Sequence, residues 1–476
     1  MHHSIFRTIL STAALGPLLL AGCSAYHEAP LDPAAVEQHL ATPTDRQLQA
    51  QADEIKHPLL KPIQLDPRDG MSPDEAAILA VILNPTLRAD RNRRDLAHAE
   101  LIRAGILPNP QLSYNYDVVT GGNTEGAVNA WGLGLSWDVT SLISHETKLN
   151  AAKAGAAAVN LDIAWQEWQI AEAARTAVYD LLALQGQLAV AQDVDRRLQE
   201  NLNVVGKAVD EHLKTALDLA AAEAAARDSH ALVLQNQRDI DHQRLQLNRA
   251  IGLPPGTRVK LTPGIVLPSR FDPPPLAELI RDLEERRLDL LGLKRGYQSQ
   301  DQTLRAAILD QFPRINIGFN RANDNTNVHS LGPAVTIDLP IFDRNQANIA
   351  AESATRKKLL DEYIARVYDA RADIASAIDD IRSINEQIKD AEAAVPNLQH
   401  LVDTYREATD RGNADVLSYY EAWNNLARKN LDVLKLKQQL ADNRIALEIA
   451  AGRYCPDTAE NPATQPTALA ESRTNP

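Results

Sequence analysis

The chain of 476 residues has little cysteine, few aromatic residues and no excess of basic charge. Its two cysteines are Cys23 and Cys455, so a lipid on Cys23 would leave one thiol and exclude an internal disulfide. The formal net charge is −14, and loss of Arg7 with a leader peptide would make it −14 − 1 = −15. This charge excludes nucleic acid as a partner because there is no basic surface for phosphates. Aromatic residues make up 4% of the chain, which favours long, closely packed helices over a thick globular core.

Motifs for catalysis or cofactor binding are also missing. The 12 histidines are dispersed, and neither His27-Glu28 nor His145-Glu146 is followed by the second histidine that a zinc-protease motif requires. The sequence contains no glycine-rich phosphate loop and no nucleophile elbow. We therefore predict no enzyme activity, no cofactor and no metal site.

Residues 1–22 have the layout of a signal peptide that ends at a cysteine. Arg7 precedes an apolar run, Ile9–Leu20, that is too short to cross a bilayer as a mature helix. Leu20-Ala21-Gly22-Cys23 forms a lipobox, so we predict lipidation of the Cys23 thiol, cleavage before it, and a further acyl chain such as palmitate on the new amino group. Ser24 resembles the signal of lipoproteins sent to the outer membrane. The alternative is an ordinary secretory signal with an incidental cysteine.

The second half of the chain repeats the first. Four pairs of residues recur in the same order, at separations of 203, 200, 198 and 200: Pro110 and Pro313, Asp138 and Asp338, Glu223 and Glu421, Gly252 and Gly452. Such a unit is too long for an ordinary solenoid repeat. We interpret it as an ancestral half-protein copied in tandem.

This duplication divides the mature chain into five segments. Residues 23–71 contain six prolines and are expected to be extended. The first repeat, residues 72–252, begins at Ser72-Pro73-Asp74-Glu75, which has the composition of a helix start. A strap with seven prolines, residues 253–276, joins it to the second repeat, residues 277–452. The polar tail, residues 453–476, is expected to be disordered.

Each repeat contains two segments with the alternation typical of β-strands, at about residues 110–140 and 313–341. The alternating apolar residues of the first hairpin are Leu112, Tyr114, Tyr116, Val118, Trp131, Leu133, Leu135, Trp137 and Val139. Those of the second are Ile315, Ile317, Phe319, Leu331, Val335, Ile337, Leu339 and Ile341, with a loop over 323–327. Each segment has nearly the length, about 9 to 11 residues, that a tilted strand needs to cross a bilayer.

A soluble hairpin packed on helices would show the same alternation. Three features favour membrane strands: repetition at matching positions, polar faces that are small or hydrophilic, and tryptophans near strand ends. The residues expected to form an interfacial girdle are Trp131, Trp137, Tyr114, Tyr116 and Phe319. Four strands cannot close a barrel, and unpaired edges find no partner in hydrocarbon. Three copies would supply 3 × 4 = 12 strands, so we predict a homotrimer that closes one barrel.

Long helices flank both hairpins. We expect four of them, at residues 146–210, 216–251, 344–410 and 414–451. Between Ile374 and Tyr405 the apolar residues follow coiled-coil spacing, and Pro396 is expected to kink this helix. A further helix, from Ser72 to about Ile106, is expected to be interrupted at Asn84-Pro85.

Four further segments stand out: Leu83–Arg88, Ala104–Gly105 with Pro110–Leu112, Ile337–Asp343, and Tyr405 with Arg411–Leu417. Through these segments the chain resembles, from about Met71 to Gly452, the TolC-type outer-membrane efflux protein family. The resemblance implies a mainly α protomer with four membrane strands, a trimer with a twelve-stranded β-barrel and an α-helical barrel, and export of small molecules or metal ions. It also implies a periplasmic adaptor and an inner-membrane transporter as partners. Two alternatives stay open: the outer-membrane conduit of a type I protein secretion system, and a lipid-anchored periplasmic coiled-coil adaptor.

By this resemblance, the two helix reversals are candidates for the periplasmic tip. The residues expected to dock the adaptor are Lys214, Thr215, Leu217, Arg411, Gly412, Asn413 and Asp415. The candidate acidic residues of the pore, which would form rings in a trimer, are Asp210, Glu211, Asp218, Asp410 and Asp415. The alternative is ordinary turn residues and solvated helix-end charges. Unaltered ion selectivity after changing Asp410 and Asp415 to Asn would remove the pore hypothesis.

The first reversal, His212-Leu213-Lys214-Thr215, departs from the family pattern because it has no glycine.

Overall fold

The computed structural model describes residues 26–455, except 67, 123–124, 412 and 415. The chain divides into two compact units after Pro43. In the described part of the first unit, helix α3 (Pro33–Leu40) begins after Asp32, whose side chain accepts a hydrogen bond from the Ala34 N–H at 3.2 Å. The predicted signal peptide, Cys23 and most of the predicted tail lie outside the described residues.

The expectation that residues 23–71 are extended is wrong for two stretches, α3 and α4 (Asp45–Asp53). Pro33 occupies the first turn of α3, where a missing N–H removes no helical hydrogen bond. Thr44 opens α4 through a capping box, in which the Gln47 side chain accepts from the Thr44 N–H at 3.0 Å. Proline therefore marks helix ends in this segment and does not exclude helices.

The helix start predicted at Ser72 is confirmed. The Glu75 N–H donates to the Ser72 hydroxyl at 3.2 Å, and the Ser72 N–H donates to the Glu75 carboxylate at 2.8 Å. The predicted interruption at Asn84-Pro85 is also present, because Asn84 ends one helix and its side chain caps the next. The three helices in this region are α5 (Pro73–Leu83), α6 (Pro85–Arg91) and α7 (Arg93–Gly105).

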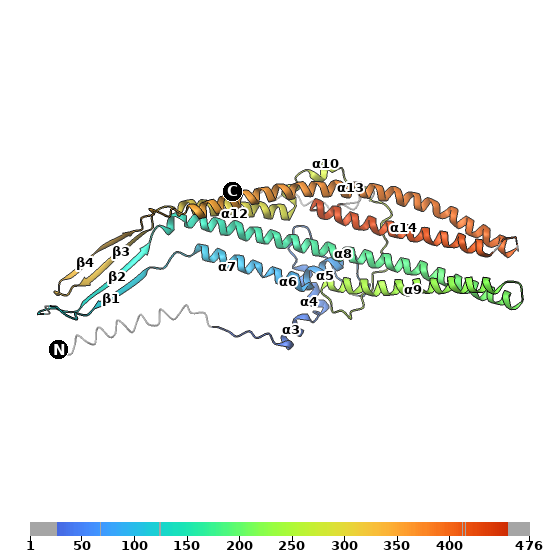
Figure 1. The fold of residues 1–476 in the computed structure, drawn as a ribbon, viewed down its shortest axis with the longest axis horizontal. Coiled ribbons are helices and arrows are strands. Elements are labelled where there is room, and N and C mark those ends of the chain that lie inside the picture. The colour runs from blue at the N-terminus through green and yellow to red at the C-terminus, as the bar shows by residue number, and fades with distance from the viewer. Residues whose placement is uncertain (1–25, 67, 123–124, 412, 415, 456–476) are drawn as a thin grey trace. The chain divides into compact units, whose positions relative to one another are not determined.

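Two pairs of long helices lie side by side, α8 with α9 and α13 with α14 (Figure 1). Their bounds are Ser141–Asp210, Ala216–Ile251, Gln346–Asp410 and Val416–Ala451. Helix α12 (Leu288–Leu309) packs between α8 and α13, and α8 also packs against α5, α7 and α14. The short helices α10 (Leu276–Ile280) and α11 (Leu283–Arg286) precede α12. Among the described residues, none of the helices combines the length and apolarity needed to cross a membrane.

The coiled-coil spacing predicted for α13 is confirmed by burial. The buried isoleucines of its stripe are Ile374, Ile378, Ile381, Ile384 and Ile388. They form one hydrophobic cluster with Leu440 and Leu447 of α14. Removing such a side chain from water contributes roughly 1.5–3 kcal/mol. This apolar contact holds the α13–α14 hairpin together, and α13 continues through Pro396 as one helix.

The ends of the two repeats are built alike. Helices α9 and α14 both end at a glycine with positive φ, Gly252 at 94° and Gly452 at 64°. The Asn84 side chain donates to the Ala250 carbonyl at 3.0 Å, and at the matching place the Arg287 guanidinium donates to the Ala450 carbonyl at 3.0 Å. Asn84 and Arg287 also each precede the next helix, α6 and α12. The duplication seen in the sequence therefore extends to individual hydrogen bonds.

The four strands form one antiparallel sheet in the order β1-β2-β3-β4. Their bounds are Gln111–Asp117, Ala130–Asp138, Ile315–Asn323 and His329–Ile337. The prediction that the last strand reaches Ile341 is wrong, because ladder pairing ends at Ile337 and Pro340 has no N–H to donate. The loop is also one residue later than predicted, since Asp324 closes a turn in which its N–H donates to the Val328 carbonyl at 3.1 Å.

His57 attaches the segment after α4 to α8. Its Nε2 lies 2.8 Å from the Ala164 carbonyl, and its Nδ1 accepts the backbone N–H groups of Leu59 and Leu60 at 3.0 Å. Only a neutral ring with the proton on Nε2 makes all three bonds. Burial lowers the pKa of His57, an effect that the Ala164 carbonyl and Glu167 oppose and that the Arg94 and Arg91 charges support. The attachment is therefore present above the ordinary pKa of 6.5 and is lost as pH falls below it.

We expect His57→Ala to weaken this attachment by about 2 kcal/mol at neutral pH, because two buried N–H groups lose their acceptor. Hydrogen exchange of the Leu59 and Leu60 amides, measured by mass spectrometry, should be about thirtyfold faster. The difference from wild type should shrink as pH falls, because a protonated Nδ1 cannot accept. His230→Ala, at an exposed histidine, serves as the control. Equal exchange in wild type and His57→Ala would contradict the assignment.

Candidate functional site

The two faces of the sheet differ in chemistry. One face is apolar except for Arg321, Asn323 and His329 near the hairpin end, and its residues are Leu112, Tyr114, Tyr116, Trp131, Leu133, Leu135, Trp137, Ile315, Ile317, Phe319, Arg321, Asn323, His329, Leu331, Pro333, Val335 and Ile337. The other face carries small and polar residues, among them Ser113, Asn115, Gly134, Ser136, Asn316, Asn320 and Thr336. A Cβ on Gly134 would lie 2.6 Å from the Ser113 hydroxyl and 2.8 Å from the Asn320 side chain, so the polar face leaves no room for one.

The apolar face is uncovered in the single chain. Phe319, at the centre of β3, is 64% exposed, and Leu331 of β4 is 76% exposed. Burying such side chains is the main favourable term in folding, so this face requires an apolar environment that one chain does not supply.

The five residues predicted for a girdle do not all lie at the ends of strands. Trp131 and Tyr116 pair with each other at the hairpin end, where the Asn129 side chain donates to the Tyr116 hydroxyl at 2.7 Å. Trp137 lies near the end of β2 that leads into α8, and its indole N–H donates to the Pro108 carbonyl at 2.8 Å. Tyr114 and Phe319 lie midway along β1 and β3. Whether any of the five meets a lipid interface stays a prediction.

Sequence reasoning did not single out Arg321. Its guanidinium lies 6.0 Å from the centre of the Trp131 ring, on the apolar face at the hairpin end. The alternation was the available signal, because Arg321 follows Phe319 by two residues and so shares its face.

Both outer strands present an edge. In the sheet that the structure describes, β1 pairs with β2 alone and β4 pairs with β3 alone. Unpaired N–H and C=O groups along such edges are templates for another strand.

The first helix reversal closes without glycine. Helix α8 ends at Asp210, His212 adopts a positive φ of 61°, and the Leu213 N–H donates to the Ala208 carbonyl at 2.7 Å. Thr215 then caps α9 through a capping box with Asp218. The Asp218 carboxylate accepts hydrogen bonds from the Thr215 N–H and hydroxyl, and these bonds lower the pKa of the carboxyl. The departure from the family pattern at His212 is therefore accommodated by a left-handed residue.

The second reversal uses the same backbone bond. Helix α13 ends at Asp410, and the Asn413 N–H donates to the Ala408 carbonyl at 2.8 Å, 200 residues after the equivalent pair. Arg411 pairs with Glu407 at 3.3 Å, one turn back along α13. Gly412 and Asp415 lie outside the described residues.

The predicted tip residues of the first repeat do come together. Lys214, Thr215 and Leu217 lie in one reversal with the three predicted acidic residues Asp210, Glu211 and Asp218. Leu213 and Leu217 are 72% and 79% exposed, so this reversal presents apolar side chains beside its acids. Leu213 was missed because a single leucine in a short turn carries no periodic signal. Nothing in the structure tests whether these residues dock a partner or line a pore, and both roles stay predictions.

We expect Thr215→Ala to weaken the start of α9 by about 1 kcal/mol, because the side-chain cap of its first turn is lost. Hydrogen exchange over residues 216–219 should become about fivefold faster, while residues 240–251 should not change. Thr355→Ala, which removes an exposed mid-helix hydroxyl bonded to the Ala351 carbonyl, serves as the control. An unchanged rate over residues 216–219 would show that the cap contributes nothing.

Known proteins resemble parts of this chain. Residues 279–453 match the family model described as outer membrane efflux protein. The cation efflux system protein CusC of Escherichia coli is 23% identical over 280 residues, which cover 56% of this chain and 60% of CusC. The match thus spans less than two thirds of that relative. Protein CyaE of Bordetella pertussis is 26% identical over 378 residues, 72% of this chain and 75% of CyaE.

The fold has close counterparts among solved structures. The crystal structure of the Campylobacter jejuni CmeC outer membrane channel matches with a TM-score of 0.69 at 14% identity, over 92% of this chain and 96% of CmeC. The predicted fold class of long helical hairpins with four strands is confirmed, as is the resemblance drawn from the sequence. Residues 279–453 thus match the outer membrane efflux protein family model, and the chain has the fold of the CmeC outer membrane channel.

Proposed function

We propose that the protein is the outer-membrane channel of a tripartite efflux system. In this proposal a homotrimer forms a conduit that carries small molecules or metal ions from an inner-membrane transporter and a periplasmic adaptor to the exterior. The observation that carries it is the sheet, which has one exposed apolar face, one small and polar face, and two open edges.

The sheet supports a shared barrel. In hydrocarbon every backbone N–H and C=O group needs a partner within the protein, so β1 and β4 must pair with other strands. Three copies give 3 × 4 = 12 strands, and antiparallel barrels of even strand number are the membrane-spanning solution. The apolar face would then meet lipid, and the polar face would line a water-filled interior.

The long helices support a conduit beyond the membrane. Helix α8 begins three residues after β2 and has 70 residues, and α13 begins nine residues after β4 and has 65. At roughly 1.5 Å per residue, each is about 100 Å long. Both end at the helix reversals, which are the surface we propose for the adaptor. The first reversal presents the exposed side chains of Leu213 and Leu217.

The proposed cargo and anchor rest on separate observations. CusC, which this chain resembles, bears the name of a cation efflux protein, and acidic rings at the reversals would raise the local concentration of cations. The lipobox at Cys23 supports a lipid anchor in the outer membrane.

Paired substitutions on β3 test the membrane strands. Phe319→Lys places a charge at the centre of the apolar face and should destabilise the inserted barrel by about 2–4 kcal/mol. The neighbouring Asn320→Lys, on the polar face, should insert normally. The measurement is the amount of folded trimer in isolated outer membranes. Equal insertion of the two variants would contradict the assignment of the apolar face to lipid and of the polar face to the interior.

Anchoring and transport are tested together in a strain lacking the gene. The intact gene should restore resistance to toxic compounds or metals that the deletion lost. Cys23→Ser should abolish incorporation of labelled palmitate and reduce the outer-membrane fraction, because the acceptor thiol is gone. Cys455→Ser is the control, since that thiol is buried in the folded chain. Labelling of Cys23→Ser at the wild-type level would overturn the anchor, and a deletion strain with unaltered sensitivity would count against efflux.

A further inference from the structure

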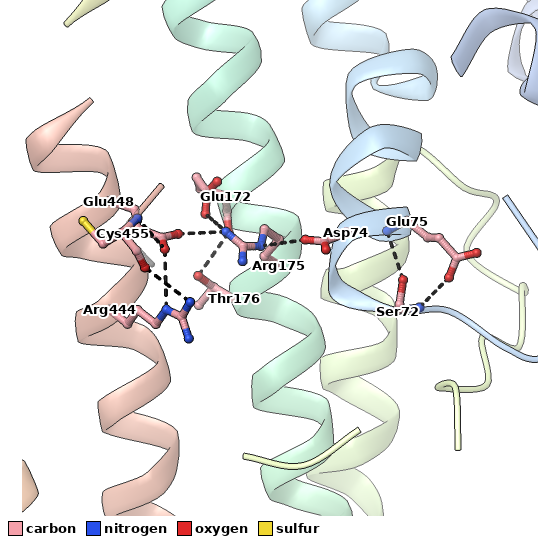
Figure 2. A network of polar contacts seen from close by, with 9 residues as sticks. All are labelled: Ser72, Asp74, Glu75, Glu172, Arg175, Thr176, Arg444, Glu448 and Cys455. Carbon is pink, nitrogen blue, oxygen red and sulfur yellow. Dashed lines mark hydrogen bonds and ion pairs between the residues drawn. The ribbon is translucent and has the colours of Figure 1, made fainter. Parts of the chain in front are cut away.

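A buried ionic cluster joins the two repeats (Figure 2). Arg175 of α8 lies between two carboxylates, its Nη1 at 2.9 Å from both Glu172 of α8 and Glu448 of α14. Its Nε lies 3.3 Å from Asp74 of α5. Glu172 and Glu448 are 0% and 1% exposed, so both carboxylates are withdrawn from water.

The two buried carboxylates are not equally satisfied. Glu448 accepts from Arg175, from the Cys455 N–H at 3.2 Å, and pairs with Arg444 at 3.5 Å. Glu172 accepts from Arg175 through one oxygen, and its other oxygen, Oε1, is buried without a hydrogen-bond partner. A buried carboxylate oxygen without a donor is costly when the group is ionised, because its charge is then not solvated, and the cost is smaller when the carboxyl is neutral.

The cluster has no second copy at the duplicated positions. At the separation of 200 that relates Asp210 to Asp410, the counterparts of Glu172 and Arg175 are Ala372 and Ala375. The counterpart of Glu448 is Asn248, which is neutral. The charges therefore do not belong to the duplicated design, and they lie where α8 of the first repeat meets α14 of the second.

The burial of these ions does not by itself stabilise the protein. Removing charges from water costs several kcal/mol per ion, and apolar replacements of buried ion pairs are often neutral or stabilising. Buried ions can instead specify one register between packed helices. The other contacts between α8 and α14 include Gln438, whose side chain donates to Asp180 at 2.6 Å, and Arg197, which lies over the Trp423 ring. The cluster adds an ion pair between the two helices to these contacts.

The charge balance points to one bound proton. The ionisable carboxyls of the cluster are Asp74, Glu172 and Glu448, and the cations are Arg175 and Arg444. Fully ionised, these five groups sum to −1, and one proton makes the cluster neutral. Burial raises the pKa of Glu172 to about 8, with Arg175 opposing and Glu448 adding to the rise. Burial also raises the pKa of Tyr454 and of Tyr179, which face the same space and stay neutral.

We propose that Glu172, Arg175 and Glu448 form a proton-sensitive clamp that sets the register of the second helical hairpin on the first. With Glu172 protonated, Arg175 is shared by one neutral and one charged carboxyl, and α14 is held against α8. Loss of the proton places two negative charges on one guanidinium nitrogen, and their repulsion loosens α14 at this level. Arg175 and Glu172 are positioning residues, and they act through the helix contact.

The stability that the clamp contributes falls as pH rises, because the folded state holds a proton on Glu172 that the unfolded chain releases. The ordinary pKa of this carboxyl is 4.5, and in the folded chain it is about 8. Between these values the unfolded state gains stability relative to the folded one as pH rises. The clamp is therefore strongest at the acidic end of this window, weakens across it and levels off above it.

Hydrogen exchange of the full-length protein in detergent, corrected for intrinsic rates, tests the clamp at about pH 6 and about pH 9. In wild type, residues 440–451 of α14 should lose protection by about threefold or more at the higher pH. Burial and Asp180 also raise the pKa of Asp442, which lies in this segment, to about 7, so the comparison is made in an Asp442→Asn background. In that background Glu172→Gln, which keeps the bond to Arg175 but cannot ionise, should show no such loss. Residues 240–251 of α9, the matching segment of the first repeat, should not respond. Glu386→Gln, at an exposed glutamate of α13, should behave like wild type.

A second variant separates register from general packing. Arg175→Lys keeps the charge but cannot reach Glu172, Glu448 and Asp74 together, so it should loosen residues 440–451 at both pH values. The same loss of protection at high pH in Glu172→Gln as in wild type would overturn the clamp, as would an equal response over residues 240–251. The clamp does not depend on the proposed function: a trimer without conductance at any pH would reject the channel and leave the exchange result standing.

Discussion

Packing against α8 is the interaction on which the second unit depends. This helix contacts α5, α7, α9, α12 and α14, and its own sequence suits each contact. Near its start, Ala151 lets α12 approach, and Ser299 donates to the Ala151 carbonyl at 2.8 Å. Further along, Trp168 is fully buried and packs edge-to-face with Tyr454, with the ring centres 4.7 Å apart. One continuous helix thus contacts elements of both repeats, and β2 ends three residues before it begins.

The two repeats have similar backbone conformations at the ends of α9 and α14, and they differ in charge where α8 meets α14. Gly252 and Gly452 end their helices in the same left-handed conformation, and a Cβ at either would lie 2.6 Å from the chain packed against it. Asn84 and Arg287 reach equivalent carbonyls with different chemistry, a neutral amide in one repeat and a guanidinium in the other. The charged residues Glu172 and Arg175 have no charged counterparts. The two repeats therefore differ in charge where α8 meets α14.

The helices and the sheet differ in where their apolar side chains lie. Along the helices, apolar residues such as Ile374 and Ile381 are buried within the chain, so these hairpins are satisfied by their own contacts. On the sheet, Leu331 and Phe319 are exposed, and the edges of β1 and β4 carry backbone groups with no strand beside them in the described chain. The helical hairpins bury an apolar stripe within the chain, although side chains such as Ile364 are exposed, whereas the sheet leaves its apolar face and two edges uncovered in the described chain. The proposed trimer and its lipid surroundings supply what the strands require.

The sequence by itself determined the features that depend on neighbours along the chain. The capping box at Ser72, the break at Asn84-Pro85, the alternation of the strands and the isoleucine stripe of α13 follow from local hydrogen bonding and periodicity, and each is present. The helices over residues 33–40 and 45–53 were missed because proline was given more weight than the caps at Asp32 and Thr44. Only the tertiary structure decided that Arg175 meets Glu448, that His57 meets Ala164, and that Tyr114 and Phe319 lie midway along their strands. Those outcomes depend on register and on contacts between residues far apart in sequence, which no local pattern encodes.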